Sequence, residues 1–249
     1  MCTVAILPRP GGFVLGHNRD ESVARARGIP PELRHVRGTA VLAPIDPDAG
    51  GTWVAVNDRG IAVCVLNARE PPERILPPEP YSRGLVALEA AAAPTVAKVA
   101  RLLDPARLAA ARAFDLVAVG PAAAIAAVHR WDGATLRVEP LAAPCMLASS
   151  LSDPVGASRE RRRAWEGWLA GRTHPASEDL ARWLASHDPE PGPRSVCFHR
   201  ADARTVSRTV VSVGRDEVEV EYLDGQPCDP RAPLCRRVLQ RAGAQLRLV

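Results

Sequence analysis

The first 21 residues constrain the fold of this chain more than any other segment, because they describe a hairpin. Residues 3–7 are apolar and read as a strand, residues 8–12 supply Pro and Gly for a turn, and residues 13–16 return as a second strand. Antiparallel pairing brings the end of the second strand back beside the start of the first. The sequence therefore predicts that the charged run at residues 18–21 lies next to Cys2.

Cys2 has the chemistry of a nucleophile that carries its own base. We expect Met1 to be removed, because the side chain at position 2 is small, and Cys2 then bears a thiol and a free α-amino group. The amine titrates near ~7.7–8.0 and a free thiol near ~8.5, so the amine can accept the thiol proton. The alternative interpretation is a small buried residue of the first strand.

Six short motifs lie within the first 85 residues. They are Met1-Cys2-Thr3, Asn18-Arg19-Asp20-Glu21, Gly50-Gly51-Thr52-Trp53, Asn57-Asp58-Arg59-Gly60, Leu66-Asn67-Ala68-Arg69 and Ser82-Arg83-Gly84. With them the chain resembles the NRDE family, also called the TANGO2 (transport and Golgi organisation 2) family. That family is similar to the cysteine N-terminal-nucleophile hydrolases, which include bile salt hydrolases and penicillin V acylases. The resemblance implies a four-layer αββα sandwich.

The resemblance also implies roles for particular residues. Asp20 falls on the catalytic aspartate of the hydrolases and would hold the α-ammonium or orient the thiol. Asn67 matches their oxyanion-hole asparagine, whose amide donates to a developing oxyanion; the alternative for Asn67 is a turn residue. Arg159 resembles their second arginine segment.

Three positions depart from the hydrolase pattern. His17 falls where those enzymes carry a catalytic arginine, and Arg19 is two residues out of step. Arg19 could steady the thiolate or bind a substrate carboxylate if it shares a face with position 17; the alternative is a surface pair with Glu21. Ser149 or Ser150 replaces another catalytic asparagine, and a hydroxyl cannot reproduce both donors of an amide. We expect His17, Asn18 and Ser149 to face the substrate.

Composition bounds the function. A chain of 249 residues fits one domain, here residues 1–249. Its core must consist mainly of aliphatic side chains, because 47% of the residues are hydrophobic but only 4% are aromatic. The 32 basic residues are dispersed among 28 acidic ones, and the run at 159–163 reads as a solvated helix face, so we expect no nucleic-acid partner. No apolar run approaches ~18 residues, so we expect no membrane partner. We expect a cytoplasmic location.

The cysteines and histidines show no metal-binding or haem-attachment spacing. There is no CxxC or CxxCH motif, and His199, two residues from Cys197, reads as structural, so we predict no metal site and no cofactor. Cys228 and Cys235 could approach each other, although a disulfide is uncommon in a reducing compartment. Because TANGO2-type proteins are linked to haem trafficking, the resemblance leaves haem open as a ligand of His or Cys.

Elements read from the sequence alternate between groups of strands and groups of helices, which is typical of a layered α+β fold. Loops are expected at 22–50 and 71–80, and a Pro-rich tail follows residue 223. Strands are predicted at 3–8, 12–17, 52–57, 61–67, 114–119, 124–131, 135–139, 194–199, 204–213 and 217–223, and helices at 82–93, 94–103, 156–171 and 177–187, with a shorter turn near 105–112.

These observations favour one function and leave another open. The leading hypothesis is a cysteine amidohydrolase that acts on a linear C–N bond of a small-molecule substrate. The alternative is a non-catalytic carrier or chaperone, for haem or an acyl metabolite, on the same fold. No sequence feature favours a third class, a protein-interaction module.

Overall fold

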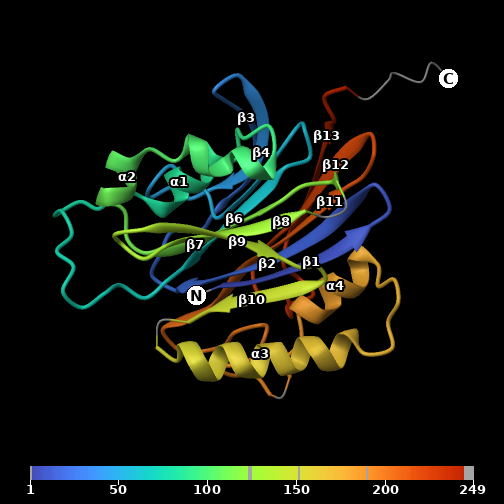
Figure 1. Cartoon of the computed structure of the whole chain (residues 1–249). Helices are drawn as coiled ribbons and strands as arrows, with labels where there is room; N and C mark the ends of the chain where they lie inside the picture. Colours follow the sequence, from blue (N-terminus) through green and yellow to red (C-terminus); the bar gives the residue numbers. More distant parts are fainter. Residues whose placement is uncertain (1, 123–124, 151, 189, 244–249) are drawn as a thin grey trace.

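Two antiparallel sheets lie face to face, and helices cover the outer face of each (Figure 1). The computed structural model describes residues 2–122, 125–150, 152–188 and 190–243. Four layers in the order helix, sheet, sheet, helix confirm the predicted α+β class and the αββα sandwich.

The strands of both sheets are antiparallel to their neighbours. In the first sheet the order is β10-β1-β2-β11-β12-β13, with β1 Cys2–Arg9, β2 Gly12–Ser22, β10 Cys145–Ser149, β11 Ala203–Val213, β12 Glu217–Asp224 and β13 Leu234–Gln240. In the second sheet the strands run in chain order from β3 to β9: β3 Ile29–Val36, β4 Thr39–Ile45, β5 Val54–Asn57, β6 Ala62–Asn67, β7 Phe114–Val119, β8 Ala126–Trp131 and β9 Leu136–Leu141.

Helices close the sandwich on its two outer sides. The second sheet is covered by α1 (Arg83–Ala90), a short 3₁₀ helix η1 (Val96–Leu102) and α2 (Pro105–Ala110). The first sheet is covered by α3 (Pro154–Leu169) and α4 (Ser177–Leu184). Ser82 and Asp153 cap the N-termini of α1 and α3 through their side-chain oxygens, which explains where both helices begin.

Strand alternation divides the hydrophobic core into three parts. In β1, Val4 and Ile6 point into the core between the sheets, whereas Ala5 and Leu7 pack under α3 and α4. A third core fills the space between the second sheet and α1. Val and Ala dominate the core between the sheets and the core under α1, as the low aromatic content predicts, whereas the core under α3 and α4 also contains Trp165 and Trp183.

The region 22–50 is not the loop that the sequence predicts. It contains β3 and β4, and β3 is hard to recognise because it is an edge strand with two consecutive prolines and only one buried position, Pro31. Two further edge strands were not predicted: β10, which has one buried position, and β13, which has none. The predicted strand at 194–199 is absent; that segment makes only isolated bridges at Phe198 and His199. Among the described helices, none has the length and apolar character needed to cross a membrane.

Candidate active site

Cys2 opens the strand that sits between β10 and β2. The antiparallel register sets Arg19 opposite it on one side and Ser149 on the other. The residue is 7% exposed and lines a cavity of about 290 Å³ at the end of the two sheets, together with Asp20 and Asn67. The hairpin thus brings the charged motif beside Cys2, as its spacing indicates.

The thiol of Cys2 has an environment that favours its protonated form. Burial raises the pKa of Cys2 above its ordinary value, and the negative charge of Asp20 raises it further. A hydrogen bond with the Asp20 backbone acts in the opposite direction. Because burial is the largest of these effects, the thiol needs a base before it can act as a nucleophile at neutral pH.

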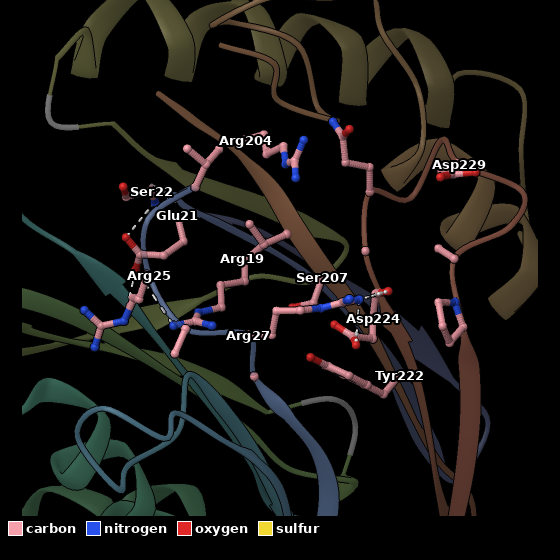
Figure 2. Close-up of a pocket in the computed structure, with 18 of the residues that line it drawn as sticks. Arg19, Glu21, Ser22, Arg25, Arg27, Arg204, Ser207, Tyr222, Asp224 and Asp229 are labelled. Carbon is pink, nitrogen blue, oxygen red and sulfur yellow. Dashed lines mark hydrogen bonds and ion pairs between the residues drawn. The ribbon is translucent and has the colours of Figure 1, made fainter. Parts of the chain in front are cut away.

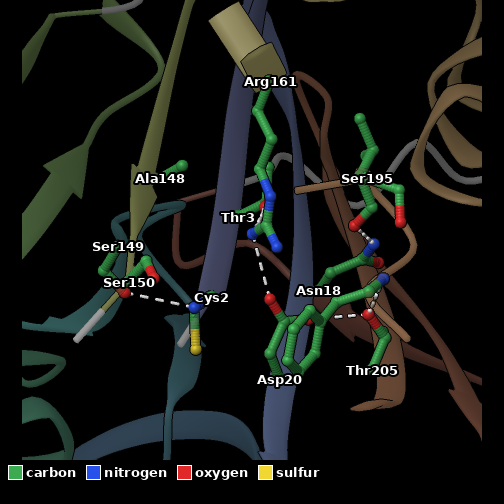
Figure 3. A network of polar contacts seen from close by, with 12 residues as sticks. Cys2, Thr3, Asn18, Asp20, Ala148, Ser149, Ser150, Arg161, Ser195 and Thr205 are labelled. Carbon is green, nitrogen blue, oxygen red and sulfur yellow. Dashed lines mark hydrogen bonds and ion pairs between the residues drawn. The ribbon is translucent and has the colours of Figure 1, made fainter. Parts of the chain in front are cut away.

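The carboxylate of Asp20 belongs to a buried polar network (Figure 3). Arg161 Nη1 lies 3.0 Å from one Asp20 oxygen and donates to Thr3 Oγ1 at 2.6 Å. Thr205 Oγ1 donates to the other Asp20 oxygen at 2.6 Å. Both charged side chains are fully buried, so α3, β1, β2 and β11 meet at one ion pair beside Cys2.

Alternation along β2 separates the Asp20 side chain from that of Arg19. Asp20 points toward α3, whereas Arg19 points between the sheets, on the same side as Cys2. The Arg19 guanidinium lies over the Trp53 ring, 4.1 Å from its centroid, and 3.5 Å from an Asp46 oxygen. Its contact with Glu21 at 3.9 Å exists, but Arg19 is buried rather than part of a surface pair. Trp53, from the Gly50-Gly51-Thr52-Trp53 motif, also lines the cavity.

Asn67 lines the cavity together with Arg83 and Arg112. It ends β6 and is partly exposed. Arg83, in the first turn of α1, is partly buried: burial and the charge of Arg112 lower its pKa, while the charge of Cys2 raises it. Arg83 belongs to the Ser82-Arg83-Gly84 motif, but no site role was predicted for it from the sequence. The motif is the one sequence signal that marks this residue.

Two glycine-containing motifs pack against each other to hold this wall in place. The amide of Thr52 donates to the carbonyl of Gly84 at 3.0 Å. A Cβ atom at Gly51 would lie 2.3 Å from the carbonyl carbon of Gly84, so only glycine permits this approach of the backbones. Trp53 follows Thr52 and Arg83 precedes Gly84, so this backbone contact fixes the positions of both residues relative to each other.

The structure does not bring His17 and Asn18 to this cavity. Asn18 points toward the helices and donates to the carbonyls of Leu184 and Val196 at 2.7 and 3.1 Å. His17 is fully buried, and within the described chain neither of its ring nitrogens has a hydrogen-bond partner. Burial, with the charge of Arg19, lowers the pKa of His17 to about 3, so a neutral ring stands where the hydrolases carry an arginine.

Ser149 lies beside Cys2, whereas Arg159 does not. The Oγ of Ser149 accepts a hydrogen bond from the Cys2 backbone nitrogen at 3.1 Å, whereas Ser150 accepts one from the Asp153 backbone. Arg159 is mostly exposed and lies 3.6 Å from Glu160, away from the cavity. The arginine of α3 that contacts Asp20 is Arg161: two residues along a helix turn the side chain by about 200°, so Arg159 and Arg161 occupy opposite faces of α3.

Comparison with solved structures places this fold in a known class. The C2A mutant of the conjugated bile acid hydrolase from Clostridium perfringens has a TM-score of 0.58 at 11% identity, over 94% of this chain and 96% of its own. Penicillin V acylase from Agrobacterium tumefaciens has a TM-score of 0.51 at 14% identity, over 90% and 86%. An N-acylethanolamine-hydrolyzing acid amidase orthologue from Caenorhabditis elegans has a TM-score of 0.51 at 13% identity, over 93% and 95%.

These neighbours are N-terminal-nucleophile hydrolases, so the chain has the fold of that class. A comparison with functionally curated proteins gave no match. The family model for Transport and Golgi organisation 2 (TANGO2) matches residues 1–129, more than half of the sequence. The chain therefore belongs to the TANGO2 family.

Replacing Arg161 with alanine should destabilise the fold strongly. The substitution leaves the buried Asp20 carboxylate without its cation, which typically costs about 3–5 kcal/mol. Arg159→Ala, on the exposed face of the same helix, is the matched control and should change stability by no more than about 0.5 kcal/mol. Urea unfolding of the two variants tests this; similar free energies of unfolding would contradict the buried network.

His17 should make stability depend on pH in the range where ordinary histidines titrate. Its folded pKa is about 3 and its unfolded pKa about 6.5, so only the unfolded chain binds the proton between these values. Stability is therefore lost as pH falls below about 6.5. Between pH 7.0 and 5.5 the wild type should lose about 1.2 kcal/mol more than His17→Gln. Parallel denaturation curves at both pH values provide the measurement, and equal losses would show that His17 is not held neutral.

Proposed function

We propose that the chain is a cysteine amidohydrolase, folded as one domain over residues 1–249, that cleaves a linear C–N bond with Cys2 as nucleophile. The observation that carries the proposal is the position of Cys2, which opens β1 in a cavity lined also by Asp20 and Asn67 and whose backbone nitrogen is held by Ser149. The names of the solved neighbours support this reaction class, because they refer to a conjugated bile acid, penicillin V and N-acylethanolamines.

The proposed reaction begins with removal of Met1, which lies outside the described residues. The free Cys2 amine takes the thiol proton, and the thiolate bonds to the carbonyl carbon of the amide. The C–N bond then breaks, the leaving nitrogen receives the proton from the α-ammonium, and a thioester remains. Water attacks the thioester with the amine again as base, which releases a carboxylic acid and restores the thiol.

Three residues support this chemistry in the proposal. Ser149 would accept a hydrogen bond from the new α-amine and so orient it toward the thiol. Asn67 would donate from the cavity wall to the oxyanion, with backbone N–H groups as further donors. Asp20, fixed by Arg161, would stabilise the α-ammonium that forms when the thiol is deprotonated.

The cavity wall suggests what the substrate carries. Arg19, Arg83 and Arg112 line the cavity together with Cys2. Burial lowers the pKa of Arg83, so an anion would stabilise its charged form. We therefore propose an amide whose acyl or amine part bears a carboxylate or a similar anion.

The carrier alternative is less well supported by this cavity. Haem iron needs an axial ligand such as His or Cys. Among the described residues that line this cavity, Cys2 is the only candidate ligand of that kind. Haem could therefore be held here through Cys2, with Arg83 and Arg112 binding its propionates. It would supply an iron centre, which the proposed hydrolysis does not use.

Native protein should begin at Cys2. The small side chain at position 2 favours removal of Met1, and the mechanism requires a free amine on Cys2. Intact-mass measurement after expression from a start codon at Met1 checks this directly. A native protein that retains Met1 would be inconsistent with the mechanism, because the nitrogen would remain a peptide amide without basicity.

Cys2→Ala should reduce amide turnover by about 10³-fold or more, because it removes the nucleophile. Its thermal midpoint should stay within a few degrees of the wild type. Cys235→Ala, on an edge strand away from the cavity, is the matched control and should retain full turnover. Covalent labelling by an electrophilic amide or β-lactone, mapped by peptide mass, should occur at Cys2.

Ser149→Asn provides the second arm of this experiment. An amide supplies two donors where a hydroxyl supplies one, so turnover should rise. The carrier hypothesis predicts another pattern: no label at Cys2, stoichiometric haem uptake, and no activity in Ser149→Asn. Unchanged turnover in Cys2→Ala would remove Cys2 as nucleophile.

A further inference from the structure

Four potential metal ligands gather at a place that no sequence motif marks. They are His187, Cys197, His199 and Cys228, and their ligand atoms all lie within 4.8 Å of one another. His187 follows α4, Cys197 and His199 lie in the segment before β11, and Cys228 lies in the loop between β12 and β13. Their spacing in the chain is irregular because three separate segments contribute, which explains why the sequence predicted no metal site.

The distances within this cluster match those of a tetrahedral zinc site. The sulfurs of Cys197 and Cys228 each lie 3.6 Å from His199 Nε2. A tetrahedral zinc with Zn–S of ~2.3 Å and Zn–N of ~2.0–2.1 Å holds sulfur and nitrogen ligands about 3.6 Å apart. The Nε2 atoms of His187 and His199 are 2.9 Å apart. Two nitrogen ligands of such a zinc are separated by about 3.3–3.4 Å, so the rings need to part by only about half an ångström.

Neighbouring groups orient the ligands. Gln226 lies 3.0 Å from His199 Nδ1, so a half-turn of its amide lets the oxygen accept the Nδ1 proton and leaves Nε2 free for a metal. The backbone of Cys197 donates to the Ser186 carbonyl at 2.9 Å, and that of His199 donates to the Gly192 carbonyl at 3.0 Å. The cluster is therefore held by a second set of contacts, as metal sites require.

We propose that these four side chains bind one zinc ion in a structural Cys₂His₂ site. Two thiolates and two imidazoles form a ligand set that suits zinc, and four protein ligands leave no open position for a water molecule. Binding releases the two thiol protons to solvent and involves no redox change.

The zinc would fix one wall of a second cavity. The loop from Gly225 to Pro233 contains Cys228 and lines a space of about 340 Å³ that Arg19 also borders (Figure 2). On its other side the site adjoins Val196, whose carbonyl accepts a hydrogen bond from Asn18 of β2. The metal would thus tie this loop to the strand that carries the charged motif.

Metal analysis of the purified full chain tests the proposal. Wild-type protein expressed with zinc in the medium and desalted should contain about one zinc per chain. The double variant Cys197→Ser/Cys228→Ser should contain less than about one tenth of that. Cys235→Ser, on neighbouring β13, and His174→Gln, outside the cluster, are matched controls and should keep the full amount.

A second measurement does not depend on any variant folding correctly. Cobalt(II) added to metal-free wild-type protein should give the intense visible bands of a tetrahedral site with a thiolate-to-cobalt band, and one equivalent of zinc should abolish them. Three results would overturn the proposal: no zinc and no cobalt bands in folded wild type, equal zinc loss in the controls, or a Cys197–Cys228 disulfide in protein isolated without oxidant.

Discussion

The buried ion pair between Asp20 and Arg161 is the interaction on which the rest of the site depends. Both side chains are fully buried, so neither charge is stable there without the other and without the hydroxyls of Thr3 and Thr205. Because these groups come from α3 and three strands, the pair fixes the helix layer to the strand that begins with Cys2. A chain that lost the pair would lose the position of Cys2, the proposed nucleophile, as well as part of its stability.

The charged motif in β2 is best understood as a set of side chains that point in alternate directions. Asn18 and Asp20 face the helices, where one bridges the end of α4 to Val196 and the other binds Arg161. Arg19 faces the opposite sheet and rests on Trp53. Of these three residues, only Arg19 therefore points its side chain into the space between the sheets, whereas the other two hold the layers in register.

Local patterns predicted the fold well, and long-range contacts were the main source of error. The N-terminal hairpin and most central strands follow from apolar runs bounded by turn residues, whereas the mostly exposed edge strand β3 gives no such signal. Arg159 and Arg161 are indistinguishable in the run at 159–163, because the choice depends on which helix face meets Asp20. Arg83 is identified as part of the site only once α1 is placed against the Gly50-Gly51 turn.

In the proposed mechanism, the reactivity of Cys2 depends on the removal of Met1. Burial raises the pKa of the thiol, and no histidine is among the described residues that line the cavity; the pKa of the buried His17 is lowered to about 3, which makes its ring a weak base. The group best placed to accept the proton is the nitrogen of Cys2, which already contacts Ser149. That nitrogen is basic only as a free amine, so in the proposed mechanism the burial that raises the pKa of the thiol would keep it inactive until Met1 is removed.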